Sequence, residues 1–307
     1  MGSTDPGDGP ATRLAERLLG RRAIREVIPA DPNHSVRWHE HDYPSPLARW
    51  NYHPEYEIHL TRKGPGKFIV GDHVGTFEAG QLTLIGSGLP HDWVSDIEPG
   101  EVLHNRDAVI QFDRKWAEQA SSFVPELAEV MPLLDQSARG IEFLGQTAAT
   151  AAACVEAMGR TTGLERLQHL FHLLAVLTRA PAEDRRYLAD VWFFPQLDRE
   201  AEAVVDIVLE YVFAHHAGTV TMAEAAALVG MAEPTFSKYF KRSTGQNFTH
   251  LVRKLRLAHA RRLLERTHKP VSDICYETGF SNLSNFNRQF LKEVGETPRQ
   301  FRQRVQA

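Results

Sequence analysis

The feature that most constrains the fold of this chain is a pattern that occurs twice near its C-terminus. The first copy reads VTMAEAAALVGMAEPTFSKYFKRSTG, residues 220–245, and the second reads VSDICYETGFSNLSNFNRQFLKEVGETP, residues 271–298. Gly230 aligns with Gly279 at a spacing of 49 residues, and the positions after these glycines align at a spacing of 50. A pattern repeated at this length indicates two copies of one supersecondary unit.

Each copy contains the parts of a helix-turn-helix. Small residues, Ala225 in the first copy and Cys275 in the second, allow a first helix to approach a second one closely. The glycine that follows permits the positive φ that a tight turn requires. The second helix then begins at a capping position, which is Glu233 in one copy and either Ser281 or Asn282 in the other. Aromatic residues at helical spacing anchor it to a core: Phe236 and Phe240, then Phe286 and Phe290.

The charge of the chain is divided unevenly. The whole sequence has a net charge of −4, but residues 219–307 contain 15 Lys and Arg against 7 Asp and Glu. The C-terminal part is therefore +8, and the 218 residues before it sum to −12. A basic segment that contains two helix-turn-helix units is the arrangement expected of a domain that binds double-stranded DNA.

The second copy, continued as DICYETGFSNLSNFNRQFLKEVGETPRQFR, resembles the signature of the AraC/XylS family of bacterial transcription regulators. The resemblance covers residues 199–307, and one departure is Cys275, where a small alanine is common. It implies that the two second helices enter successive turns of the major groove, held apart by a basic linking helix at 251–266. The exposed positions it implies are Pro234, Ser237 and Lys238 on the first helix and Ser284, Asn285 and Arg288 on the second.

The residue types at these positions suit the edges and backbone of DNA. An arginine such as Arg288 can donate two hydrogen bonds to guanine O6 and N7, and an asparagine such as Asn285 can pair with adenine N6 and N7. Lys241, Arg242 and Lys292 are better placed for phosphate, which adds affinity without sequence information.

The remainder of the chain predicts an N-terminal all-β barrel followed by helices, in front of an all-α domain. Residues 35–113 alternate apolar and polar side chains between glycines and prolines, as short strands do, and look like the cupin barrel common among sensors of this family. We expect a flexible leader at 1–34, a helical and dimerising segment at 114–180, a linker at 181–198 and the DNA-binding domain at 199–307.

A ligand or metal site is expected inside the barrel, where alternation along one strand would direct residues 51, 53 and 57 to the same face. Cupins that bind metal commonly use two histidines spaced HxH, a glutamate four residues later and a further histidine, which here correspond to Asn51, His53, Glu57 and His91. Asn51 breaks this pattern, because an amide is a poor ligand for zinc-like ions. Two interpretations therefore stay open: a divalent ion such as zinc held by His53, Glu57 and His91, or a polar pocket for an organic ligand such as a sugar or carboxylate. Arg49, Tyr52 and Tyr56 are expected near its mouth.

The function expected from these features is sequence-specific regulation of transcription under control of a small polar effector. Two alternatives are a metal-dependent cupin enzyme and a nonspecific DNA-binding protein; no phosphate loop, dinucleotide fingerprint or nucleophile elbow supports catalysis. The expected partners are promoter DNA, the effector, a second copy of the chain and, for an activator, RNA polymerase. Neither a secretory signal nor an apolar run long enough to span a bilayer is present, so we expect a cytoplasmic location.

Overall fold

The computed structural model describes residues 23–28, 34–45, 49–191, 193, 199–215, 217–218, 220–244 and 246–306. Contacts between residues divide the chain into two compact units. The first unit contains the residues up to Glu26 and those from Pro32 to Leu197, and the second contains Val27–Asp31 and the residues from Asp198 onward.

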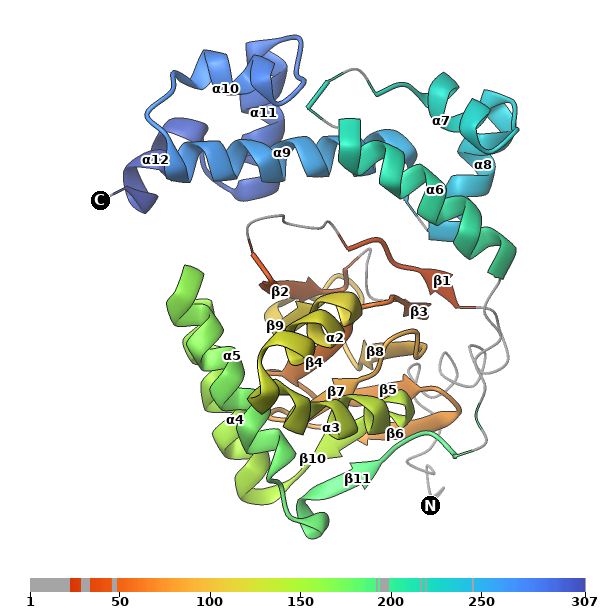
Figure 1. Ribbon diagram of the computed structural model, residues 1–307, viewed down its shortest axis with the longest axis vertical. Helices are drawn as coiled ribbons and strands as arrows, with labels where there is room; N and C mark the ends of the chain where they lie inside the picture. The colour runs from red at the N-terminus through yellow and green to blue at the C-terminus, as the bar shows by residue number, and fades with distance from the viewer. Residues whose placement is uncertain are drawn as a thin grey trace. The chain divides into compact units, whose positions relative to one another are not determined.

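Two β-sheets form the first unit (Figure 1). One sheet has the strand order β1 (Ile24–Arg25), β3 (Asn51–Tyr52), β8 (His91–Ser95), β5 (Gly66–Val70) and β6 (His73–Phe77). The other has the order β11 (Arg185–Tyr187), β10 (Ile141–Phe143), β7 (Leu82–Ile85), β4 (Tyr56–Thr61), β9 (Leu103–Phe112) and β2 (Val36–Tyr43). Side chains of both sheets line one interior cavity, so the predicted N-terminal β-barrel is confirmed.

Strand β4 shows how the sequence separates the inside of this barrel from its outside. Tyr56, Ile58 and Leu60 lie in a hydrophobic core, whereas Glu57 and His59 lie against polar groups of the interior. Successive side chains of a strand point to opposite faces of a sheet, so the alternating sequence YEIHLT fixes this division. The polar side chains of Glu57 and His59 therefore point into the interior of the barrel.

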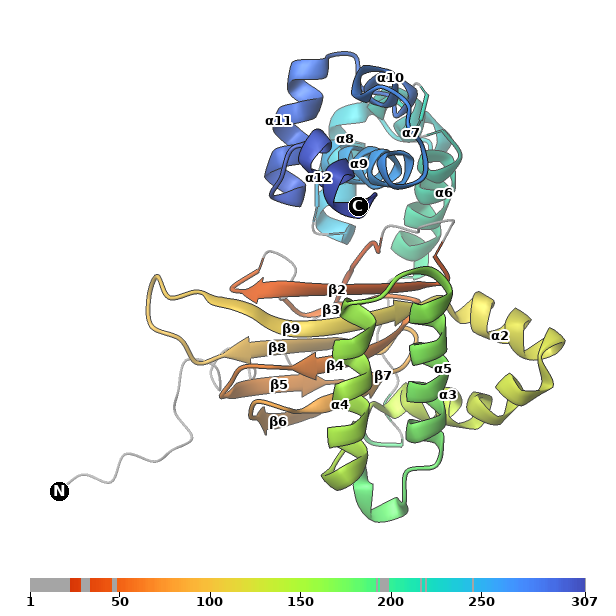
Figure 2. The ribbon, with the colours of Figure 1, turned by 90° about the vertical axis from the view of Figure 1, so that its left-hand side faces the viewer.

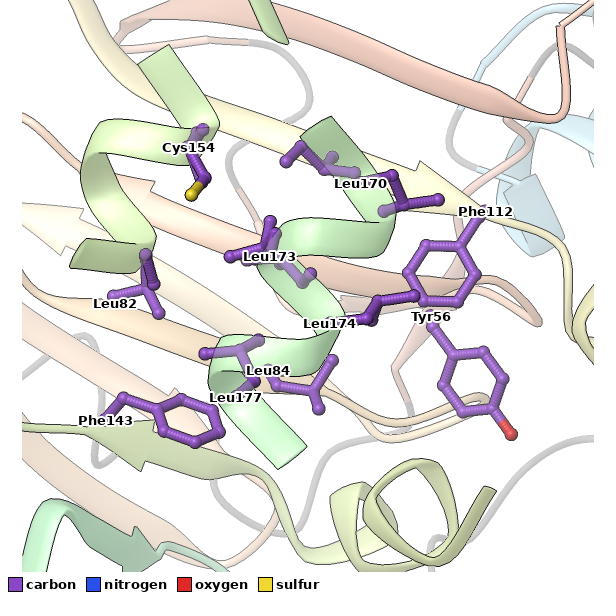
Figure 3. Close-up of a cluster of buried hydrophobic side chains, with 14 of the residues drawn as sticks. Tyr56, Leu82, Leu84, Phe112, Phe143, Cys154, Leu170, Leu173, Leu174 and Leu177 are labelled. Atoms are coloured by element: carbon purple, nitrogen blue, oxygen red, sulfur yellow. The ribbon is translucent and has the colours of Figure 1, made fainter. Parts of the chain in front are cut away.

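Helices cover the outer face of the six-stranded sheet (Figure 2). The chain continues from β9 into α2 (Arg114–Phe123), η1 (Pro125–Val130), α3 (Met131–Gln136) and η2 (Ser137–Arg139), and later into α4 (Gly145–Gly159), α5 (Gly163–Thr178) and η3 (Ala182–Asp184). Leu173 and Leu177 of α5 lie beside Leu82 and Leu84 of β7, and Leu170 belongs to the same core (Figure 3). The face of α5 that carries these leucines is therefore part of the core.

Three expectations about segments are corrected by the strands. The predicted leader 1–34 is not wholly flexible, because β1 pairs in parallel with β3; residues 1–22 and 29–33 lie outside the described residues. The segment 114–180 is not wholly helical, because it contains β10. The predicted linker 181–198 contains η3 and β11, and β11 completes the sheet by pairing with β10. Residues 192 and 194–198 lie outside the described part.

From Arg199 onward, the described residues of the second unit form helices and the turns between them, as predicted. Its elements are α6 (Arg199–His215), α7 (Met222–Leu228), α8 (Glu233–Thr244), α9 (Phe248–Arg266), α10 (Val271–Glu277), α11 (Leu283–Val294) and α12 (Pro298–Val305). The helix pairs α7–α8 and α10–α11 correspond to the two copies of the repeated pattern. The turn glycines Gly230 and Gly279 have φ values of 66° and 84°, the left-handed conformation that glycine adopts without strain.

The long helix α9 joins two separate cores. Its first half contributes Leu251 and Leu255 to a core that contains Phe236 and Phe240, and its second half contributes Ala260 and Leu264 to another. The second core contains Phe286 and Phe290, whose equivalents in the first copy are Phe236 and Phe240. Both pairs of aromatic residues are fully buried. At a rise of about 1.5 Å per residue, α9 is roughly 28 Å long.

Candidate functional site

The second helix of each pair presents its polar residues to solvent. On α8 the side chains of Pro234, Lys238, Lys241 and Arg242 are exposed, while Ser237 is half-buried. On α11 the exposed side chains include Ser284, Asn285, Arg288 and Lys292. In Figure 2, where α9 is seen nearly end-on, α8 and α11 lie on the same side of that helix.

The start of α11 is capped, and its two best candidates for base contact interact. The Asn282 side chain accepts a hydrogen bond from the backbone N–H of Asn285 at 2.9 Å, so Asn282 rather than Ser281 is the cap. Arg288 Nη2 donates to Asn285 Oδ1 at 3.0 Å. Because a guanidinium has five N–H donors, Arg288 keeps others for a base edge.

Helix α8 has a more cationic exposed face than α11. A shallow surface pocket lies along it, lined by Pro234, Thr235, Lys238, Tyr239 and Arg242. The Arg242 guanidinium lies 5.4 Å from the centre of the Tyr239 ring, which holds this arginine along the helix. Such a face is suited to phosphate oxygens.

A second polar site lies inside the barrel, around Glu57. His53 Nε2 and Gln111 Nε2 lie 3.1 and 2.8 Å from Glu57 Oε2, and His59 Nδ1 lies 3.2 Å from Oε1. His91 Nε2 is 3.7 Å from Oε1. All five side chains are buried, and the cavity beside them has a volume of about 40 Å³.

The ring orientations of two histidines are fixed by backbone carbonyls. His53 Nδ1 lies 3.1 Å from the carbonyl oxygen of Glu55, and His91 Nδ1 lies 2.8 Å from that of Leu89. Each Nδ1 therefore bears the proton that is donated to the carbonyl, and each Nε2 is directed at Glu57. Donor atoms of His53, Glu57 and His91 all lie within 4.8 Å of one another.

An ion-paired network continues from His59 to the far side of the cavity. Asp107 lies 3.0 Å from His59 Nε2 and 3.2 Å from His41 Nδ1, and Arg106 Nε donates to its carboxylate at 2.7 Å. Arg106 is only 1% exposed and also donates to the carbonyl oxygen of Trp93 at 3.0 Å. A buried arginine needs such partners, because an uncompensated charge in the interior is costly.

The pKa values in the barrel follow from burial and from these ion pairs. Burial opposes a charge on His53 and on His59, but their contacts with Glu57 and Asp107 outweigh it and raise both pKa values to about 9. Burial lowers the pKa of His91 to about 4. Burial favours the neutral form of Asp107, yet the neighbouring His59 and Arg106 lower its pKa to about 2.

The structure brings most of the predicted barrel residues together, in a different way from that expected. Asn51, His53 and Glu57 do not share one strand, because β3 ends at Tyr52 and β4 begins at Tyr56. Asn51 lines the cavity and is the register partner of His91. Arg49 is not among the residues that line the cavity; its carbonyl oxygen accepts a hydrogen bond from Asn51 Nδ2.

Tyr56 was wrongly placed at the mouth of the pocket: it packs against Phe112 in the core beneath the helices (Figure 3). The sequence interpretation also missed Arg106, Asp107 and Gln111 of β9. The alternation of DAVIQ along this strand is a signal that could have placed Asp107 and Gln111 inside the barrel.

Comparison with known families agrees with both halves of this description. The model of an AraC-like ligand binding domain matches residues 31–174, and that of a helix-turn-helix domain matches residues 225–304. The chain belongs to the AraC family. Among the described residues of this AraC-family chain, no helix is long and apolar enough to cross a bilayer.

Curated relatives match the C-terminal unit. The HTH-type transcriptional activator RhaR of Klebsiella pneumoniae is 31% identical over 108 residues, which are 35% of this chain and 38% of RhaR. An uncharacterized HTH-type transcriptional regulator of Staphylococcus aureus is 33% identical over 98 residues, 32% of this chain and 13% of that protein. The chain thus spans well under half the length of these relatives. Both names are those of regulators, in agreement with the expectation that the chain is not an enzyme.

Solved structures include similar chains. A probable AraC family transcriptional regulator from Rhodopseudomonas palustris is 32% identical, with a TM-score of 0.32, and the match covers 34% of this chain and 97% of that one. ToxT from Vibrio cholerae is 13% identical, with a TM-score of 0.41, over 89% of this chain and all of that one.

Proposed function

We propose that this AraC-family chain regulates transcription by binding promoter DNA with helices α8 and α11, under the control of a small polar ligand held in the barrel. The observation that supports the proposal best is the equivalence of Lys238 and Arg288. These cations are 50 residues apart, occupy the same position in the two copies of the repeat, and are both exposed.

Helices α8 and α11 are held by the two ends of one helix, α9, which is roughly 28 Å long. In this proposal they enter successive major-groove turns of one duplex, which are about 34 Å apart. Because the two copies lie in tandem in one chain and differ in sequence, the site of one protomer is asymmetric. A site of two unlike halves separated by about 10 base pairs is the expected target.

Selection of binding sites from a random duplex library, followed by competition with unrelated DNA, tests the proposal. The full chain should prefer its selected site by about a thousandfold or more. The double variant Lys238→Ala/Arg288→Ala should lose that preference, whereas Lys115→Ala, which removes an exposed cation of the first unit, should retain it. Equal binding to every duplex, with a steep salt dependence, would instead identify a nonspecific DNA-binding protein.

A second copy of the chain is the proposed protein partner, through helix α5. The leucines of this helix that face the sheet are buried, but Leu164 is 82% exposed and Phe171 is 37% exposed. A homodimer contact would therefore involve only this outer edge of the helix. Analytical ultracentrifugation should show a dimer for the natural chain and a weaker one for Leu164→Glu; a monomer at all concentrations would refute this contact. RNA polymerase is proposed as a further partner only if the chain activates transcription.

A further inference from the structure

The polar cavity in the barrel is too small for most organic effectors. Its volume is about 40 Å³, whereas a site for one water molecule needs about 10–15 Å³ and pockets for drug-sized organic ligands measure about 300–1,000 Å³. The space suits an ion with one or two water molecules.

The carboxylate of Glu57 faces Nε2 of both histidines, so a cation can be shared between them. Nδ1 of His53 and Nδ1 of His91 are committed to backbone carbonyls, so the group that each ring turns toward the carboxylate is Nε2. A neutral imidazole so oriented has a lone pair on Nε2, and a lone pair 3.1 Å from a carboxylate oxygen is repelled by it. Either a proton or a metal ion between the two atoms removes this repulsion.

The donor atoms match a metal ion in type and spacing. Two imidazole nitrogens and one carboxylate oxygen form a common set for divalent transition metals with open positions for water. The three donor atoms already lie within 4.8 Å of one another, close to the separations of about 3–4 Å that bonds of about 2.1 Å produce.

Partners of these three side chains complete the site. A metal-bound histidine usually donates its other N–H to a carbonyl or carboxylate, which His53 and His91 do. Glu57 is itself held by Gln111, whose amide oxygen accepts a hydrogen bond from Arg37 Nη1 at 2.9 Å. The site is thus oriented before any ligand enters.

We propose that His53, Glu57 and His91 bind one divalent first-row transition-metal ion and that this ion is the effector of the chain. The first half of the inference, metal binding, stands on the geometry of the barrel alone. The second half rests on the proposed function, because it requires that the chain bind a preferred DNA site.

Metal content and metal affinity test the first half. The untagged full-length chain, stripped with chelator and dialysed against Zn²⁺ or Co²⁺, should retain about one equivalent of metal by mass spectrometry of the digested protein. Gln111→Ala should weaken Co²⁺ binding by about 10- to 100-fold, and His91→Gln should weaken it further. His104→Gln, which replaces an exposed histidine, should bind as the natural chain does. Tryptophan fluorescence and circular dichroism check that each variant folds.

Less than a tenth of an equivalent of either metal in the folded natural chain would overturn metal binding and leave a proton as the shared cation. Equal loss of affinity in His91→Gln and His104→Gln would also overturn it. DNA affinity for the selected site, measured with and without Zn²⁺, tests the second half. A change of tenfold or more supports the ion as effector; bound metal with unchanged DNA affinity refutes it. If no selected site exists in either state, the proposed function itself fails.

Discussion

Replacement of Arg288 by alanine tests whether this residue contacts a base edge or only the phosphate backbone. Arg288 is exposed on α11 and one of its N–H groups is engaged by Asn285, which leaves the guanidinium oriented with other donors available. A bidentate contact between arginine and guanine contributes about 1–3 kcal/mol of discrimination against other bases. Since 1.4 kcal/mol corresponds to a factor of ten, Arg288→Ala should reduce affinity for the preferred site by about 5- to 150-fold.

The loss should be confined to the base pairs that α11 reads. Fluorescence anisotropy with the selected duplex, and with duplexes substituted at single positions, should show that Arg288→Ala no longer distinguishes bases in one half of the site. Lys292→Ala is the matched control, because it removes an exposed cation from the same helix. It should weaken binding to all sequences alike and reduce the slope of log K against log salt by about 0.9.

A uniform loss of affinity across all duplexes in Arg288→Ala would refute the assignment of this residue to a base edge. So would an unchanged preference at every position. If Lys292→Ala altered sequence preference while Arg288→Ala altered only the salt slope, the two roles would be reversed. Helix α11 would then face DNA in a different orientation from the one proposed.

Two further substitutions test the packing that supports the sites. Gly230→Ala should lower the free energy of unfolding by about 1–2 kcal/mol, because its φ is 66° and an added Cβ would meet nothing within 4 Å, so that only backbone strain remains. Gly230→Asn should cost less, and equal costs in urea denaturation followed by circular dichroism would contradict this reason. Asp107→Asn should destabilise the barrel by about 3–5 kcal/mol, because it leaves the buried Arg106 without its carboxylate. Tryptophan fluorescence reports on this change, since all five tryptophans precede residue 193, and a loss no larger than that of the exposed Asp42→Asn would contradict it.

The helix pairs were predictable because their determinants are local. A glycine at a fixed distance before two buried phenylalanines defines the turn, the second helix and its inward face within about 15 residues. Gly279, Phe286 and Phe290 are therefore enough to predict α11 from its own sequence, without reference to tertiary contacts. The choice between Ser281 and Asn282 as its cap could not be made, because both side chains can accept the hydrogen bond.

The barrel was predictable in class but not in detail, because sheets depend on pairing between distant residues. Ile141–Phe143 and Arg185–Tyr187 are too short to show a period, and only their pairing with each other and with β7 makes them strands. The burial of Arg106 was equally hidden, since arginine is rarely buried and its partners come from other strands.

The cluster around Glu57 was predicted for an incomplete reason. A single strand was expected to align Asn51, His53 and Glu57, but the strand is interrupted between Tyr52 and Tyr56. His53 still reaches Glu57, because its ring is turned by the hydrogen bond to the carbonyl oxygen of Glu55. A sequence pattern cannot reveal such a turn, which depends on the path of three residues.

The position of Val27 limits where the chain can be divided into separate fragments. Two residues after β1, this valine is 6% exposed and belongs to the same hydrophobic core as Val205 and Val208. A fragment that starts at residue 35, or one that starts at residue 198, removes a side chain whose burial contributes about 1.5–3 kcal/mol and leaves a hole in the helical half. Val27 is thus part of the hydrophobic core of the second unit, and a fragment of that unit is incomplete without it.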